Sequence, residues 1–316
     1  MNFRTPITIP KNTNLIDYNS KIVGIGSCFV ENMATKLDYF KLDYLINPFG
    51  IIFNPISIEK LVFRIVNRAY FDENDLVFHN QLWHCFEVHS RLSSFSKSEL
   101  LFNLNLMLDR SFVEFKKGTH FMITYGSSWV YRNLECQKIV ANCHKIPQNQ
   151  FSKELLSSQI ITSSIQNTIE LLGSINPNAQ LIFTVSPVRH LKDGFVENNV
   201  SKANLLTAVF EITHKKAQNT VYFPSFEIMM DDLRDYRFFD DDMLHPNKFA
   251  IQYIWEQLVL SNFSNEAVLM MKEVEDIQKM RLHKIIKIES AESHIFNKKI
   301  SDKIKQIQTQ FPQIIF

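Results

Sequence analysis

A chain of 316 residues, 45% of them hydrophobic and 21% charged, has the composition of a globular protein and the length for one large domain or two small ones. Its formal net charge of +1 gives no reason to expect nucleic acid or an anionic membrane surface as a partner. No apolar run approaches the roughly 20 residues of a membrane-spanning helix, and residues 1–10 lack the pattern of a signal peptide. We therefore expect a cytoplasmic protein with no membrane span and no nucleic-acid partner.

The four cysteines, Cys28, Cys85, Cys136 and Cys143, do not form a disulfide framework in a chain of this length. No pair of them has the C-x-x-C spacing of a zinc site or a redox motif. With only 7 glycines, the chain also lacks the G-x-G-x-x-G and G-x-x-x-x-G-K-[ST] phosphate loops. These features predict a reducing compartment, no metal site and no tightly bound cofactor.

Short apolar runs separated by helical segments predict an α/β protein. The first strand is expected at 22–25, a helix at 31–37 and a second strand at 42–46. After an insertion, strands and helices alternate at 119–125, 152–172, 180–185, 201–214, 220–223 and 248–260, with Ser152, Ser201 and Asn247 suited to cap the helices. This order is typical of a three-layer α/β/α sandwich with a mostly parallel sheet.

Two segments fall outside the alternation. Residues 56–117 contain a helix, a hairpin and a second helix, which we interpret as a cap over the carboxyl edge of the sheet. Residues 262–316 are polar and have a helical period, as in an appended helical arm. We therefore predict an α/β domain over residues 1–261, with a cap insertion at about 56–117, and a helical extension over 262–316.

Polar or conformationally special residues follow four of the predicted strands. They are Gly26-Ser27-Cys28, Asn47-Pro48-Phe49-Gly50, Gly126-Ser127-Ser128 and Ser186-Pro187-Val188-Arg189-His190. Because ligands of an open parallel sheet bind beyond the carboxyl ends of its strands, these segments describe the rim of an active site. Asp242 and His245 follow the last strand, and with Ser27 or Cys28 they form a nucleophile, base and orienter set.

Several motifs make the chain resemble the GSCFA-domain family, which is grouped with the SGNH (GDSL-like) hydrolases. They are Gly26-Ser-Cys-Phe29, Asn47-Pro-Phe-Gly50, Val140-Ala-Asn-Cys-His-Lys145, Val185-Ser-Pro-Val-Arg-His190, and Asp235-Tyr-Arg-Phe238 followed by His245-Pro246. The resemblance runs in order over about residues 3–260. It implies a flavodoxin-like, SGNH-type α/β/α fold and ester or acyl-transfer chemistry, without naming a substrate.

The turn after the first strand carries two candidate nucleophiles. In the SGNH pattern the nucleophilic serine is third in a Gly-Asp-Ser turn, and aligning Gly26 with that glycine puts Cys28 at the nucleophile position. A shift by one residue makes Ser27 the nucleophile but loses the tight-turn glycine. A helix N-terminus here would lower the pKa of the Cys28 thiol. The alternative is a buried structural cysteine beside a serine that caps the helix.

Asp242 and His245 match the D-x-x-H motif that closes SGNH domains. Three residues apart on a turn or at a helix start, their side chains share a face. His245 would take the proton of the nucleophile, while Asp242 would set the tautomer of the ring and stabilise its protonated form. The pair therefore supplies the general acid/base and its orienter.

The chain departs from the SGNH pattern in its oxyanion donors. The resemblance assigns this role to the backbone N–H of the nucleophile, to a glycine after the second strand, for which Gly50, preceded by Asn47, is suited, and to an asparagine after the third. The third strand ends instead in Gly126-Ser127-Ser128, so Asn142 or the hydroxyl of Ser128 would substitute, an Asx turn being the alternative role of Asn142. Further candidates are His144 as a second acid or base, Arg189 as an anion clamp or an ion-pair partner, and His190 beside the substrate.

These residues predict an acyl-ester hydrolase or acyltransferase that works through a covalent acyl-enzyme on Cys28 or Ser27. The expected substrate is a small-molecule or carbohydrate acyl ester. An acyl-CoA donor would be needed only by a transferase. The competing class is a non-catalytic binding module that retains the fold. The motifs leave the oligomeric state open.

Overall fold

The computed structural model describes residues 5–214, 219–282 and 291–316. Its centre is a five-stranded sheet in the order β10-β9-β5-β1-β2. All four strand pairs in it are parallel. The strands are β1 (Lys21–Gly26), β2 (Asp43–Ile46), β5 (His120–Tyr125), β9 (Gln180–Val185) and β10 (Thr220–Tyr222). The predicted α/β fold with a parallel sheet is confirmed.

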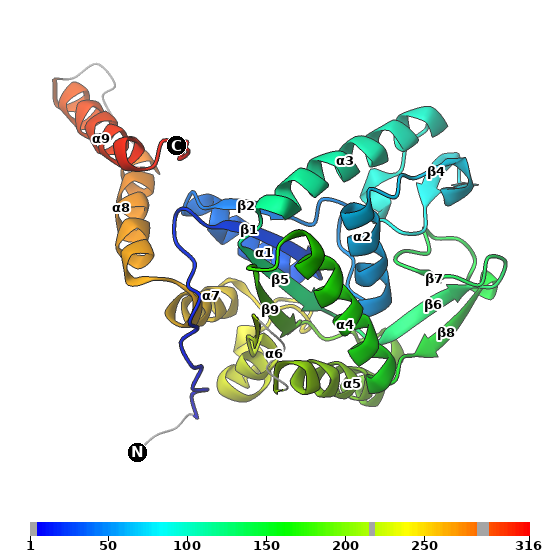
Figure 1. Cartoon of the computed structure of the whole chain (residues 1–316). Coiled ribbons are helices and arrows are strands. Elements are labelled where there is room, and N and C mark those ends of the chain that lie inside the picture. The colour runs from blue at the N-terminus through cyan, green and yellow to red at the C-terminus, as the bar shows by residue number, and fades with distance from the viewer. Residues whose placement is uncertain (1–4, 215–218, 283–290) are drawn as a thin grey trace.

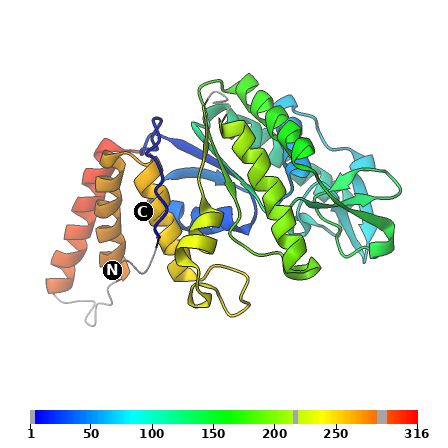
Figure 2. The same cartoon turned by 90° about the horizontal axis from the view of Figure 1, so that it is seen from below.

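The middle strands are apolar on both faces, as expected for a sheet that is covered on both sides. Val23 of β1 belongs to the core on one face, and its neighbour Ile22 belongs to the core on the other. Helices α2 (Pro55–Asn67), α3 (Lys97–Lys117), α4 (Ser158–Ile175) and α5 (Phe195–His214) cover the first face. Helices α1 (Cys28–Tyr39) and α7 (Lys248–Asn262) cover the second face, and α8 (Asn265–Leu282) packs beside them (Figures 1 and 2).

Two predicted helices begin at other residues. The start of the 152–172 helix was wrong, because residues Phe151–Leu155 form strand β8, and α4 begins only at Ser158, with Ser157 as its cap. Strand β8 pairs with β6 (Trp129–Asn133), which also pairs with β7 (Ile139–Val140), in an antiparallel sheet that the sequence analysis did not predict. Helix α5 begins at Phe195, before the predicted Ser201. Asn247 caps α7 as predicted.

Only part of the segment expected as a cap reaches the carboxyl edge of the sheet. Its helices α2 and α3 pack into the core on the first face of the sheet, together with α4. Its hairpin consists of β3 (Leu76–His79) and β4 (Leu82–Cys85). The chain then returns to the carboxyl edge, where the His89 N–H donates to the Phe49 carbonyl (3.0 Å).

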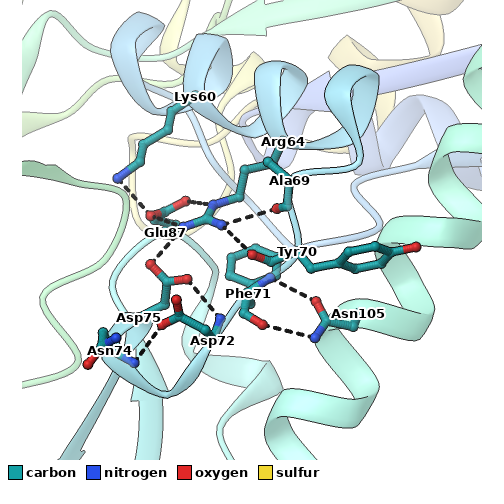
Figure 3. A network of polar contacts seen from close by, with 10 residues as sticks. All are labelled: Lys60, Arg64, Ala69, Tyr70, Phe71, Asp72, Asn74, Asp75, Glu87 and Asn105. Atoms are coloured by element: carbon teal, nitrogen blue, oxygen red, sulfur yellow. Dashed lines mark hydrogen bonds and ion pairs between the residues drawn. The ribbon is translucent and has the colours of Figure 1, made fainter.

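A network of ion pairs ties the hairpin segment to α2 (Figure 3). The carboxylate of Glu87 accepts hydrogen bonds from the Arg64 guanidinium and lies 2.7 Å from Nζ of Lys60. Arg64 also reaches Asp75 (2.7 Å) and the backbone carbonyls of Ala69 and Tyr70. Because Glu87 lies two residues before His89, this network fixes the part of the insertion that borders the candidate site.

The predicted helical extension comprises α8 and α9 (Ala291–Gln310). Met271 and Val274 of α8 and Ile307 of α9 belong to the same core cluster as α1 and α7. The Gln278 amide also donates to the Tyr39 carbonyl at the end of α1 (3.0 Å). The extension therefore packs beside the helices that cover the second face, with α9 lying against α8 (Figures 1 and 2). Among the described residues, no helix has the length and apolar character needed to cross a membrane.

Candidate active site

The turn from β1 to α1 is built on Gly26. Its φ is +150°, and a Cβ added there would lie 2.2 Å from the Thr124 carbonyl oxygen, so the position requires glycine. Ser27 follows as the N-cap of α1: its hydroxyl accepts the Phe29 N–H (3.3 Å), and its side chain is buried. Cys28 is the first residue of the helix and is partly exposed. Of the two candidate nucleophiles, Ser27 therefore has a capping role, and Cys28 is the more accessible.

Asn47 braces this turn. Its side-chain oxygen accepts the Gly26 N–H (2.9 Å), and its carbonyl accepts the N–H of Gly50 (2.8 Å) and a guanidinium N–H of Arg91 (2.7 Å). The Gly50 N–H, predicted as an oxyanion donor, is thus already engaged. A Cβ added at Gly50 would lie 2.3 Å from Cβ of His89, so this glycine allows the insertion to approach closely. Asn47 and Gly50 shape the edge of the sheet.

Asp242 and His245 are directly bonded. Nδ1 of His245 lies 2.6 Å from Oδ2 of Asp242, while Oδ1 accepts the backbone N–H groups of Leu244 (2.8 Å) and His245 (2.9 Å). These backbone hydrogen bonds, followed by the one from the imidazole, lower the pKa of Asp242 to about 2. The carboxylate thereby fixes the ring and leaves Nε2 for proton transfer.

Arg189 connects this loop to the end of β9. Its backbone N–H donates to the Leu244 carbonyl (3.2 Å), and its guanidinium lies over the rings of Phe239 (4.4 Å to the centroid) and Tyr236 (5.6 Å). These contacts place the guanidinium against the loop that carries Asp242 and His245. Arg189 therefore holds the loop of Asp242 and His245 at the carboxyl edge of the sheet.

Lys202, which the sequence analysis did not select, lies at the same edge. Its side chain comes from α5 and is 1% exposed. Its Nζ donates to the carbonyls of Gly126 (2.7 Å) and Ser186 (2.8 Å), just beyond the ends of β5 and β9. The sequence contains a pattern that indicates its burial: Lys202 falls on the same helical stripe as the buried residues Asn198, Leu205 and Val209.

His190 lies between these groups. Its ring stacks on Phe53 with a centroid distance of 5.4 Å, and a Cβ added at Gly126 would lie 3.2 Å from its Nε2. Burial lowers the pKa of His190 to about 3, and the nearby charges of Lys202 and His245 act in the same direction. His190 is therefore a neutral imidazole at the rim, and its Nε2 has no hydrogen-bond partner among the described residues.

The electrostatics of Cys28 differ from the prediction. Burial raises the pKa of its thiol, and the carboxylate of Glu31 on the same helix raises it further. The N–H groups of Cys28 and Phe29 at the helix N-terminus and the charge of Lys202 act in the opposite direction, but they do not outweigh burial. The expectation of a lowered thiol pKa was therefore wrong, because the sulfur is less solvated than a helix-end position suggests.

Three predicted residues have partners elsewhere. Ser128 is buried and donates two hydrogen bonds to Ser201 of α5: its backbone N–H to the hydroxyl (2.8 Å) and its own hydroxyl to the carbonyl (3.1 Å). Asn142 accepts the His144 N–H (2.8 Å), which is the alternative Asx turn. His144 stacks on His84 (4.6 Å), and its Nε2 lies 2.7 Å from the Cys85 carbonyl oxygen. Among the contacts of the described residues, none joins these three to Cys28 or His245.

The donor groups for a metal are also dispersed. Within residues 5–214, 219–282 and 291–316, no cluster of three or more His, Cys, Asp or Glu side chains could hold a metal ion. The polar groups at the carboxyl edge are instead a thiol, a lysine and two imidazoles with one carboxylate partner. This set is suited to proton transfer and nucleophilic attack.

The fold and this edge define an α/β/α protein with a cysteine-bearing turn after its first strand and an Asp–His pair after its last. The chain belongs to the GSCFA family, whose model matches residues 21–258. This range begins with β1 and ends within α7, so it includes the whole candidate site.

Among solved structures, the chain is similar to a carbohydrate esterase of family 3 from Talaromyces cellulolyticus, with 9% identity, 81% of this chain and 99% of that chain covered, and a TM-score of 0.37. It is also similar to an acetyl xylan esterase from the rumen bacterium Butyrivibrio proteoclasticus, with 12% identity, 78% and 64% covered, and a TM-score of 0.38. No curated protein matches the chain.

Proposed function

We propose that this protein is an acyl-ester hydrolase or acyltransferase that forms a thioester on Cys28. The observation that carries the proposal is the 2.6 Å contact between Asp242 and His245, in a loop that Arg189 ties to the carboxyl edge of the sheet. Cys28 begins α1 at that edge. A nucleophile, a base and an orienter are thus supplied by segments far apart in the chain.

In the proposed reaction, Nε2 of His245 takes the proton of the Cys28 thiol, and the sulfur attacks the carbonyl carbon of the ester. The C–O bond to the alcohol breaks, the alcohol leaves with the proton from His245, and the acyl group stays on sulfur as a thioester. Water in a hydrolase, or an acceptor hydroxyl in a transferase, then attacks the thioester while His245 removes its proton. The thiol is regenerated, and no other reactant is needed for hydrolysis.

The N–H of Cys28 is the oxyanion donor that we assign, because it lies at the open N-terminus of α1 beside the reacting sulfur. Gly50 and Ser128 are not assigned this role, since the Gly50 N–H and both polar groups of Ser128 are already bonded. For the substrate we propose an acyl ester of a small molecule or a carbohydrate. A transferase would in addition use an acyl donor such as acyl-CoA.

A non-catalytic binding module is the second candidate, and one observation favours it: burial and Glu31 raise the pKa of the Cys28 thiol, which works against a thiolate nucleophile.

Turnover of p-nitrophenyl acetate by the wild type, with mass spectrometry of the acyl-enzyme, distinguishes an enzyme from a binding module. We expect Cys28→Ala to abolish turnover and His245→Ala to slow it by about 10³-fold.

The matched control is Cys136→Ala, which removes an exposed cysteine and should leave turnover unchanged. Ser27→Ala should lower stability through the lost helix cap without removing the acyl-enzyme. Turnover that survives in His245→Ala at the wild-type rate would exclude the mechanism. A wild type that neither turns over acyl esters nor retains an acetyl group would favour the binding module.

A further inference from the structure

Two contacts hold Arg189 next to the loop segment that carries His245. The Arg189 N–H donates to the carbonyl of Leu244, the residue before His245 (3.2 Å). The Arg189 guanidinium lies over the ring of Phe239, which forms a β-bridge with Pro246, the residue after His245. The guanidinium therefore borders the place where a substrate of the proposed reaction would lie.

The charge of Arg189 lacks the partner that comparable arginines have. The described arginines that are half-buried are Arg64, Arg132 and Arg189. Arg64 donates from two nitrogens to the carboxylate of Glu87. Arg132 does the same with Glu154, at 2.7 and 2.9 Å. Among the described residues, by contrast, no carboxylate forms an ion pair with Arg189.

The neighbours of the Arg189 guanidinium are two aromatic rings and a sulfur atom. The ring centroids of Phe239 and Tyr236 lie 4.4 and 5.6 Å from the guanidinium carbon. Attraction to a ring face stabilises the charge, but it supplies no lone pair for the five N–H groups of a guanidinium. Within the described part of the chain, the hydrogen bond of this side chain goes to Sδ of Met230 (3.7 Å), a weak acceptor. Most of its donors are thus available to a ligand.

The carboxylates of the loop that pair with a side chain have other partners. Asp235 binds the guanidinium of Arg237 (3.1 Å), and Asp242 binds His245 (2.6 Å). A half-buried charge without a counter-ion is unfavourable, because it loses part of its hydration and gains no compensating ion pair. The position of Arg189 is therefore suited to receive an anion that arrives with the substrate.

We propose that Arg189 binds a carboxylate of the substrate, so that the protein acts on acyl esters that also carry a carboxylate group. The fork of guanidinium donors matches the two oxygens of a carboxylate, and one positive charge matches one negative charge. The inference rests on the proposed function, because it takes the ester to be cleaved at Cys28 and His245. The carboxylate can belong to the alcohol or to the acyl group, and kinetics distinguish these two sources.

The test compares two acids with their own methyl esters as substrates. In 4-acetoxybenzoate the carboxylate is on the alcohol side, and in mono-4-nitrophenyl adipate it is on the acyl side. The preference is the ratio of kcat/KM for the acid to kcat/KM for its neutral methyl ester, both measured from release of the phenol. We expect a ratio of about ten or more for one of the two pairs in the wild type. Ratios of one or less for both pairs would overturn the proposal.

Arg189→Gln should lower that ratio by about tenfold or more, and Arg189→Lys, which keeps the charge without the fork, should lower it less. A role of Arg189 in holding the loop alone would slow the acid and its methyl ester equally. An unchanged ratio in folded Arg189→Gln would therefore refute the proposal, whatever the loss of activity. If Arg189→Gln does not fold, the wild-type ratio and that of Arg189→Lys decide.

Arg237→Gln is the matched control. Arg237 is an exposed arginine of the same loop, it also lies over an aromatic ring (Phe238, 5.5 Å), and it is already paired with Asp235. This variant should keep the wild-type ratio. If it lowers the ratio as much as Arg189→Gln does, the preference comes from the general charge of the loop, and the proposal fails.

A binding measurement separates this proposal from the proposed function. The dissociation constants of 4-hydroxybenzoate and adipate, and of their methyl esters, are measured by NMR titration with the wild type and Arg189→Gln. A wild type without turnover that binds an acid more tightly than its methyl ester, with the difference lost in Arg189→Gln, would refute the proposed function alone. Turnover that depends on Cys28 but shows no preference for a carboxylate would refute the role of Arg189 alone.

Discussion

The carboxylate of Asp242 holds His245 at two points: Oδ2 lies 2.6 Å from Nδ1 of the ring, and Oδ1 accepts the backbone N–H of the same residue at 2.9 Å. One side chain thus sets both the tautomer of the imidazole and the turn from which it projects. The effect on the tautomer can be tested separately from the effect on the turn, because an amide in place of the carboxylate keeps the turn and changes the tautomer.

We expect Asp242→Asn to lower kcat for an acyl ester by about 10³-fold or more, with little change in KM. The amide oxygen can still accept the backbone N–H groups of Leu244 and His245, whereas an NH2 group facing Nδ1 places the ring proton on Nε2. Steady-state kinetics with p-nitrophenyl acetate measure the effect. Asp241→Asn, at the exposed neighbouring position, is the control. Equal kcat values for Asp242→Asn and the wild type would show that the pair does not serve as base and orienter.

Gly26→Ala should destabilise the protein by about 2–4 kcal/mol, since φ is +150° and the new Cβ would lie 2.2 Å from the Thr124 carbonyl oxygen. The matched control is Gly173→Ala in α4, where an added Cβ meets nothing within 4 Å. This control should be more stable by about 0.5–1 kcal/mol. Urea unfolding of both variants gives the comparison, and similar free energies of unfolding would rule out the steric argument.

Glu87→Gln should cost about 2–3 kcal/mol of stability, because it removes the buried carboxylate that Arg64 and Lys60 share, although Arg64 keeps its contact with Asp75 (Figure 3). Burial alone would raise the pKa of Glu87, but the hydrogen bonds from Arg64 and Lys60 outweigh it and lower the pKa. The stabilisation is therefore present near neutral pH and is lost as the pH falls through the lowered pKa.

Glu154→Gln is the control for this substitution, because it breaks the more exposed pair of Glu154 with Arg132. It should cost at most about 1 kcal/mol. The free energy of unfolding of both variants, measured in urea at pH 7, makes the comparison. If the two substitutions cost the same, the network of Figure 3 contributes no more than a surface ion pair.

His144 predicts a pH dependence of stability. Burial lowers its pKa to about 4, whereas an unfolded histidine titrates near 6.5. Between these values the unfolded chain binds a proton that the folded chain does not, so stability is full above pH 6.5 and falls as the pH drops toward 4. This residue alone should account for about 2–3 kcal/mol of the loss between pH 7 and pH 4.

The measurement is urea unfolding of the wild type and His144→Gln at several pH values over that range. Glutamine retains an N–H donor for the Cys85 carbonyl, which lies 2.7 Å from Nε2 of the histidine. The variant should lose less stability on acidification than the wild type does. Parallel curves for the two proteins would mean that His144 is not buried in its neutral form.

Residues close together in the sequence account for much of what could be predicted. The strands of the central sheet are short apolar runs bounded by turn residues, and the order of strands and helices indicated the parallel topology. The Asp242–His245 contact follows from a spacing of three residues, and the cap of α7 from Asn247 immediately before it. Local periodicity and local hydrogen bonds are properties of short segments, so they could be predicted before the fold was known.

Contacts between distant segments decided the rest. The segment 151–155 is a strand because β6 pairs with it. Burial of Cys28 outweighs the helix N-terminus that the sequence places beside it. Lys202 reaches the carboxyl edge because α5 packs beside β9, so that Nζ can donate to the carbonyls just beyond β5 and β9. Solvation and long-range pairing depend on the folded chain as a whole, so short segments of sequence do not reveal them.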